Sequence, residues 1–246
     1  MRIAVISDIH GNCVALDAVL ADIREQRVDQ LVCLGDAIQG GAQPAETVAR
    51  LRALACPVVM GNADAWLLTG EETGTEEVTE RLAAVRAWSL SQLSAEDRAF
   101  IGNFQPEITV ELGPGWRLLC FHGSPTSFDD IILPETPDDE AVRLLQPRDG
   151  QILTGGHTHR QQIRSLGTAL FFNPGSVGFP YSPPQPDGIT PIDPWAEYAI
   201  VGAPDEGRFA LEFRRVPYDV AALRHSYETS GRPFADEEIA QYRRPS

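Results

Sequence analysis

The chain has 246 residues, of which 43% are hydrophobic, and a formal net charge of -15 at pH 7. This length and composition predict a soluble globular chain with a sizeable core, and the negative charge argues against binding to duplex nucleic acid or to an anionic membrane. No run approaches the roughly 20 apolar residues of a membrane-spanning helix. The four cysteines form no C-x-x-C pair, which excludes a zinc knuckle or a thioredoxin-type motif. Free thiols predict a cytoplasmic location.

Short apolar runs alternate with helical patterns over the first 62 residues. Strands are expected at residues 3–6, 31–34 and 58–60, and helices at residues 14–23 and 45–54. Each expected strand is followed by Gly and polar residues. This β-α-β-α-β order with short connections is typical of parallel strands.

The rest of the chain mixes helices with further strands. Residues 66–103 are expected to form a helical insertion, with helices at 80–90 and 95–101. Strands are expected at 108–110, 117–121, 152–154, 162–166, 168–172, 197–201 and 209–216, and helices at 138–145, 220–229 and 235–244. The segment 178–194 is rich in Pro and Gly and is expected to be a loop. No linker divides the chain, so residues 1–246 are expected to form a single domain.

The expected strands end in polar residues that can act as metal ligands. They are Asp8, His10, Asp36, Asn62, His122, His157 and His159. Ligands of open α/β sheets bind at the carboxyl ends of strands, so these side chains are expected to share one cleft. Imidazole, carboxylate and amide groups suit Mn, Fe, Zn, Co or Ni. Seven side chains are more than one tetrahedral zinc ion can bind, so the set predicts two ions that share a carboxylate.

Each of these motifs is weak when it is taken alone. The Asp8-x-His10 pair is also compatible with a strand end before a helix that Asn12 caps. The His157-x-His159 pair is also compatible with an exposed turn. Their recurrence at five strand ends favours the metal interpretation. His225 has no such partner in the sequence and is expected to be a surface residue.

The five blocks Asp8-x-His10, Gly35-Asp36, Gly61-Asn62, His122-Gly123 and Gly156-His157-x-His159 together resemble the calcineurin-like metallophosphoesterases. The following Asn173-Pro174-Gly175-Ser176 is similar to a loop of the bacterial and archaeal branch, which includes small phosphodiesterases and diadenosine tetraphosphatase-like proteins. The resemblance implies an α/β fold, a four-layer αββα sandwich of two mixed β-sheets flanked by helices. It also implies two divalent metal ions, with Mn expected and Fe, Zn, Co or Ni as alternatives.

The resemblance further implies a division of the ligands and a reaction. Asp8, His10 and His159 would hold one ion, and Asn62, His122 and His157 the other, with Asp36 between them. The expected reaction is hydrolysis of small phosphodiesters or nucleotides, in which a hydroxide that bridges the ions attacks phosphorus. Asp36, Asn62 and His122 are therefore the expected catalytic residues, and Asn62 and Arg160 the expected substrate contacts. An exposed surface ion pair is the alternative for Arg160.

The sequence departs from the family pattern after Asn62. Protein-phosphatase-like members often continue Gly-Asn-His, with that histidine beside the leaving group as a general acid, but Ala63 stands here. Asp64 is a candidate for the acid, although it would also suit a role in orienting a ligand histidine. The change favours a phosphodiester or polyphosphate over a phosphoprotein, because their leaving groups are more stable anions. Tyr181 and Trp195 are candidates for stacking on a base, with simple packing as the alternative.

Three other functions compete with this hypothesis. A protein phosphatase-like phosphomonoesterase would share the metal ligands. A non-catalytic scaffold, such as the retromer subunit of this superfamily, is expected to lose ligand histidines, whereas all seven ligands are present here. A nucleotide-binding α/β protein would need a Gly-rich phosphate loop, and neither G-x-G-x-x-G nor a P-loop occurs.

Overall fold

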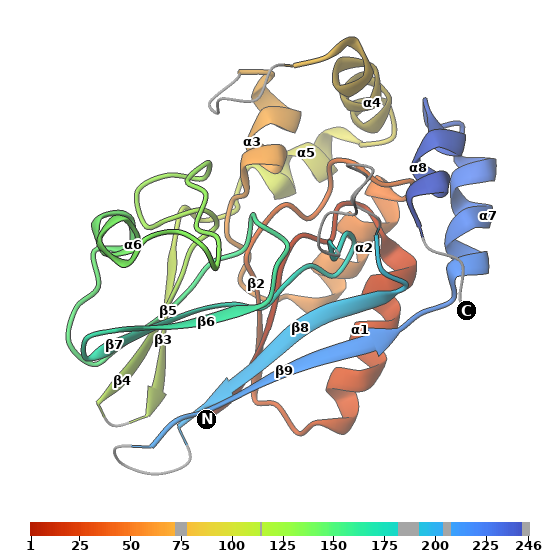
Figure 1. The fold of residues 1–246 in the computed structure, drawn as a ribbon. Coiled ribbons are helices and arrows are strands. Elements are labelled where there is room, and N and C mark those ends of the chain that lie inside the picture. The colour runs from red at the N-terminus through yellow and green to blue at the C-terminus, as the bar shows by residue number, and fades with distance from the viewer. Residues whose placement is uncertain (72–77, 114, 182–191, 204–207, 243–246) are drawn as a thin grey trace.

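A computed structural model describes residues 1–71, 78–113, 115–181, 192–203 and 208–242. Its centre consists of two β-sheets that pack face to face, with helices outside them (Figure 1). The first sheet has the strand order β2-β1-β8-β9. Its strands are β1 Arg2–Ile6, β2 Gln30–Cys33, β8 Trp195–Gly202 and β9 Ala210–Pro217. β1 pairs in parallel with β2, while β8 is antiparallel to both of its neighbours.

The second sheet has the strand order β3-β4-β5-β7-β6. Its strands are β3 Ile108–Gly113, β4 Trp116–Cys120, β5 Gln151–Thr154, β6 Gln162–Leu166 and β7 Ala169–Asn173. The three central strands are parallel, and the two edge strands pair antiparallel to their neighbours. Both sheets are therefore mixed. The carboxyl ends of β4 and β5 lie at one edge, where His122 and His157 follow them in the chain.

Eight helices are present in the described parts of the chain. They are α1 Cys13–Glu25, α2 Pro44–Leu54, α3 Asn62–Thr69, α4 Glu80–Ser91, α5 Ala95–Ile101, α6 Asp138–Leu145, α7 Val220–Ser230 and α8 Ala235–Gln241. α3, α4 and α5 lie together at the top of Figure 1, and α7 and α8 lie on the opposite side of the molecule from α6. No helix in these parts is long and apolar enough to cross a membrane.

Alternation along the strands builds the layers. On β1, Ala4 and Ile6 pack in one core with residues of α1 and α2, whereas Ile3 and Val5 lie in a second core between the sheets. The second sheet contributes one face to that inner core, and its other face packs on α6. Because successive strand residues point to opposite faces, each central strand serves two cores. The result is the expected four-layer αββα sandwich.

Most expected elements are present within a few residues, but the segment after α2 differs. No strand forms at residues 58–60: Val58 and Val59 make only isolated bridges, to Cys33 and Gln105. The chain then turns at Gly61 and enters α3 directly at Asn62, a helix that the sequence did not predict. Two residues of pairing are too few for a strand, and an early helix aims Asn62 into the site. Residues 72–77 of the expected helical insertion and residues 182–191 of the Pro-rich loop lie outside the described residues.

Candidate metal centre

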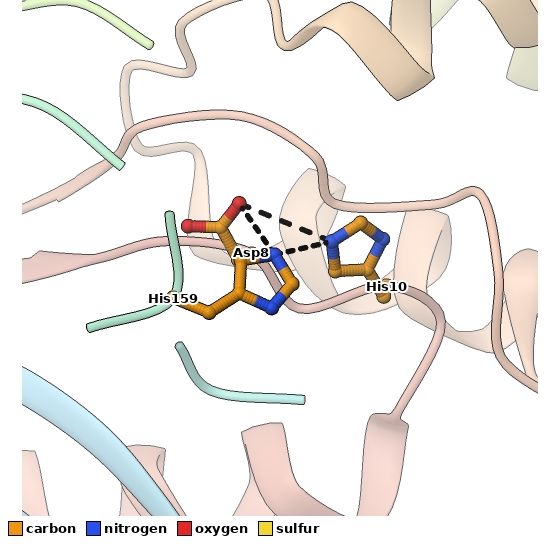
Figure 2. A group of neighbouring side chains, drawn as sticks. All are labelled: Asp8, His10 and His159. Carbon is orange, nitrogen blue, oxygen red and sulfur yellow. Dashed lines mark hydrogen bonds and ion pairs between the residues drawn. The ribbon is translucent and has the colours of Figure 1, made fainter. Parts of the chain in front are cut away.

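Asp8, His10 and His159 form a first group of potential metal ligands. Asp8 and His10 follow β1, and His159 follows β5 in the chain, yet their ligand atoms all lie within 4.8 Å of one another. Asp8 Oδ1 is 3.3 Å from His159 Nε2 and 3.9 Å from His10 Nε2. Figure 2 shows the carboxylate and the two imidazoles pointing toward one another. These three side chains surround a common centre.

Asp36, His122 and His157 form a second group with the same property. Asp36 Oδ2 is 3.3 Å from His122 Nε2 and 3.8 Å from His10 Nε2, so Asp36 lies between the two groups. Asn62 joins the second group, because its Oδ1 is 3.0 Å from His122 Nε2. The structure therefore brings together all seven residues that the sequence indicated as ligands.

Backbone carbonyls orient three of the four histidine rings. The Nδ1 atoms of His10, His122 and His159 lie 2.7, 2.8 and 2.8 Å from the carbonyl oxygens of Gln39, Leu34 and Phe179. Because a carbonyl only accepts, Nδ1 must donate its hydrogen there. In a neutral imidazole, the lone pair of Nε2 then faces the centre of the site. This is the tautomer and orientation that a metal ligand requires.

The buried atoms at the centre fit a cation. His10 Nε2 and His159 Nε2 are only 3.1 Å apart, so two lone pairs would face each other without a positive charge between them. Asp8 Oδ1 is buried and has no hydrogen-bond partner. A buried carboxylate oxygen without a donor is costly, and a metal ion would satisfy it. The site's donor chemistry therefore fits divalent ions.

The charges of the site also favour cations. Burial would raise the pKa of Asp36, but the neighbouring His122 outweighs burial and the pKa falls below its usual range. Asp8 behaves in the same way beside His159. Burial lowers the pKa of His10. For His122, burial acts in that direction too, but the Asp36 carboxylate outweighs it and raises the pKa to about 10. Both carboxylates thus remain ionised at neutral pH.

The backbone of the site is unusual. Nine non-glycine residues have positive φ in the described parts of the chain, and five of them are potential ligands. These five are Asp8, His10, Asp36, His157 and His159. Positive φ is uncommon outside glycine, although Asn, Asp and His adopt it more often than other residues, and it persists where the surroundings enforce it. Gly61 shows the crowding, because a Cβ there would lie 2.0 Å from Asp36 Oδ1.

Asp64 lies behind the ligands rather than among them. It is fully buried, and its two carboxylate oxygens accept the N–H groups of Ala37 and Ile38, each at 3.0 Å. Burial raises the pKa of Asp64 to about 7. The bonds hold the loop that follows Asp36, which supports a positioning role over the role of leaving-group acid.

Other residues singled out from the sequence have clear local roles. Asn12 caps α1 by accepting the N–H of Ala15 at 3.0 Å. Arg160 forms two 3.1 Å hydrogen bonds to the exposed Glu135, and it is not among the described residues that line the cleft. A phosphate contact by Arg160 would require this pair to break. His225 is exposed on α7, as expected.

A cleft of about 400 Å³ opens over the ligands. Its described lining includes His10, Asp36, Asn62, His157 and His159, together with residues of α4 and α8. Tyr181 lines it and stacks on His159 with ring centroids 4.7 Å apart, but Trp195 is not among its described lining residues. The cleft therefore connects the ligands to a wall made by segments distant in sequence.

That wall contains two residues that sequence reasoning missed, Arg232 and Glu238. Arg232 is nearly buried, donates from Nε to the carbonyl of Gly40 at 2.7 Å and pairs with Glu238 at 3.2 Å. Gly40 follows Gln39, whose carbonyl binds His10. Arg232 thus fixes the loop behind a ligand. No local pattern links residues almost 200 positions apart, so the sequence held no signal for this contact.

Comparisons with known proteins place this site in a family. Residues 1–190 match the sequence model of the calcineurin-like phosphoesterase superfamily domain, so the chain belongs to that superfamily. An uncharacterized protein of Methanocaldococcus jannaschii is 32% identical over 235 residues, which cover 89% of this chain and 88% of that protein.

Two solved structures are similar over nearly the whole chain. A metallophosphoesterase from Sphaerobacter thermophilus is 26% identical with a TM-score of 0.71, and the match covers 98% of each chain. A hypothetical protein from Pyrococcus horikoshii has a TM-score of 0.80 at 21% identity, and covers 97% of this chain and 96% of its own. The second likeness concerns the fold alone. Membership of the superfamily implies a hydrolase of phosphoester bonds that binds divalent metals.

Proposed function

We propose that this protein hydrolyses small phosphodiesters or nucleotides with the help of two divalent ions, Mn²⁺ in the first instance. Asp8, His10 and His159 would hold one ion, Asn62, His122 and His157 the other, and Asp36 would contact both. The observation that carries the proposal is the convergence of buried donor atoms in two groups, with three imidazole Nε2 atoms turned inward by the backbone carbonyls that bind Nδ1.

The ions, when bound, supply charge neutralisation at the phosphate and activation of the attacking water. The protein's own residues hold the candidate ligands in position. Asp64 holds the loop of Asp36 in place, and the Nδ1 bonds keep the imidazoles oriented. Ala63 lines the cleft, and its methyl side chain has no proton to give to a leaving group. This supports a substrate whose leaving group departs as a stable anion, such as an activated phosphodiester, rather than an alkyl phosphomonoester.

A hydrolysis assay tests the proposal. Protein stripped with EDTA is compared with protein reloaded with Mn²⁺, on bis(p-nitrophenyl) phosphate and on p-nitrophenyl phosphate. We expect activity only after reloading, with the diester preferred, and two ions per chain by elemental analysis. His159→Ala should lower kcat/KM by more than about 100-fold, because even residues that only orient ligands contribute 10- to 100-fold. His225→Ala, an exposed histidine, is the matched control.

The other functions predict different results in the same assay. Two bound ions without turnover of any phosphoester would indicate a metal-binding scaffold. A preference for the monoester would indicate a phosphomonoesterase. Activity that survives EDTA and the loss of His159 would overturn the proposed site.

A further inference from the structure

Exposed apolar side chains gather at the mouth of the metal cleft. In the described parts of the chain, seven large hydrophobic residues are exposed. Three of them line this one cleft: Leu82, Ile131 and Tyr181, which are 39%, 52% and 42% exposed. Trp66 and Val85 line it as well. Scattered exposed hydrophobics need no explanation, but a group at the rim of one cavity indicates a surface that a ligand covers.

The mouth is held in place by contacts outside the cleft. Trp66 lies under the guanidinium of Arg86, 5.6 Å from its ring centroid, and Arg86 also donates to the Trp66 carbonyl at 2.8 Å. The loop of Ile131 is tied to β6, because Gln162 Nε2 donates to the carbonyl of Ile132 at 2.6 Å. A pocket that is already formed loses little entropy when a ligand binds.

The charged part of the cleft wall does not match a second phosphate. Arg81 and Arg232 are the arginines in the described lining, and both bind Glu238, at 3.0 and 3.2 Å. Arg232 is also committed to the carbonyl of Gly40. A second phosphate would have to displace Glu238 from these partners, whereas a neutral ring would leave the pairs intact.

We propose that the mouth formed by Trp66, Leu82, Val85, Ile131 and Tyr181 binds a neutral aromatic ester group of the substrate, while its phosphate lies at the metal ligands. The proposal rests on the proposed function. It narrows the substrate to singly charged phosphodiesters with a flat apolar or aromatic substituent. Aromatic side chains bind such rings through offset or edge-to-face contacts. Dinucleoside polyphosphates are then poorer substrates.

Two substrates with one leaving group test this inference. Phenyl p-nitrophenyl phosphate and methyl p-nitrophenyl phosphate both release p-nitrophenolate. They differ only in the ester group that stays on phosphorus, which is the group that the mouth would bind. In Mn²⁺-loaded protein, Ile131→Ala and Leu82→Ala should lower kcat/KM for the phenyl ester about 3- to 10-fold, as expected for partial loss of an apolar contact. The kcat/KM for the methyl ester should change less than about twofold, because its methyl group hardly reaches the mouth.

The controls are exposed apolar residues away from the cleft. Ile163 on β6 and Val142 on α6 are 56% and 44% exposed, and Ile163→Ala and Val142→Ala should leave both substrates unchanged. Equal losses on both esters, or no loss on either, would overturn the inference. So would efficient hydrolysis of diadenosine tetraphosphate relative to the phenyl ester.

Binding separates this inference from the proposed function. Calorimetry with phenylphosphonate and methylphosphonate needs no turnover. If the protein hydrolyses nothing but binds phenylphosphonate more tightly, and Ile131→Ala removes that preference, the hydrolytic function fails and the aromatic site stands. If hydrolysis occurs but the two phosphonates bind equally, the aromatic site fails and the function stands.

Discussion

Asp36 and Asp64 differ in what their carboxylates touch. Asp36 Oδ2 faces His122 and His10 from a position between the two donor groups. Asp64 is more deeply placed and binds only backbone N–H groups among its described hydrogen bonds. Two aspartates 28 positions apart in sequence thus have separate roles. Asp36 lies between the two donor groups, and Asp64 holds the loop that follows Asp36.

We predict that Asp36→Asn lowers kcat/KM and Mn²⁺ binding more than Asp64→Asn does. Asp36→Asn removes a negative charge shared by both donor groups, so it should abolish binding of the second ion and nearly all turnover. Asp64→Asn replaces one carboxylate oxygen, which accepts a backbone N–H, with an NH₂ group that cannot accept it. It should lower kcat/KM roughly 10- to 100-fold, as for other residues that orient ligands. Mn²⁺ titration and kcat/KM measure both effects. Equal losses would contradict the assigned roles.

At the level of secondary-structure elements, the two C-terminal helices support the site. Residues 1–190 match the superfamily domain, yet α8 and the turn that precedes it supply part of the cleft wall, through Glu238 and Arg232. Leu223 and Tyr227 of α7 pack with Ile239 of α8 and with Phe179, whose carbonyl orients His159. Arg232, between the helices, reaches the loop behind His10. Docking of these helices therefore bears on two ligands.

We predict that Arg232→Met lowers the free energy of unfolding by about 3 kcal/mol, because it breaks a buried ion pair and leaves the Gly40 carbonyl without its donor. It should also weaken Mn²⁺ binding. Arg81→Met is the matched control. It removes more exposed pairs, to Glu237 and to the same Glu238, and should lower the free energy of unfolding by about 1 kcal/mol or less. Urea denaturation and metal titration measure the two effects. Equal destabilisation by both variants would contradict this account.

At the scale of the whole molecule, the helical layer is joined to the first sheet by charge as well as by apolar packing. Asp22 on α1 accepts hydrogen bonds from Arg214 on β9 at 2.7 and 3.0 Å, and from Tyr198 on β8. The Arg214 guanidinium holds the pKa of Asp22 below its ordinary value of 3.8. These bonds connect elements almost 200 residues apart and close the sheet against the helix.

This arrangement gives a pH-dependent contribution to stability. Because the folded pKa of Asp22 lies below the unfolded value, its contribution is present at neutral pH and is lost as the pH falls below about 4. Asp22→Asn should lower the free energy of unfolding by about 1 kcal/mol at neutral pH, and the difference from wild type should shrink under acid conditions. Urea denaturation across pH measures it. A difference that grows on acidification would refute this assignment.

The sequence by itself determined most of the elements, though not α3, and the set of candidate ligands. Apolar periodicity is a local pattern, and polar residues at strand ends meet wherever parallel strands end at the same edge of a sheet. Most elements and the candidate ligands can therefore be predicted from the sequence alone. Only the tertiary structure decided how the ligands are held. The carbonyls that orient His10, His122 and His159 carry no side-chain signal. The contact of Arg232 with Gly40 and the apolar mouth of the cleft form only through packing between segments distant in sequence. The pairing of Arg160 with Glu135 also depends on the fold.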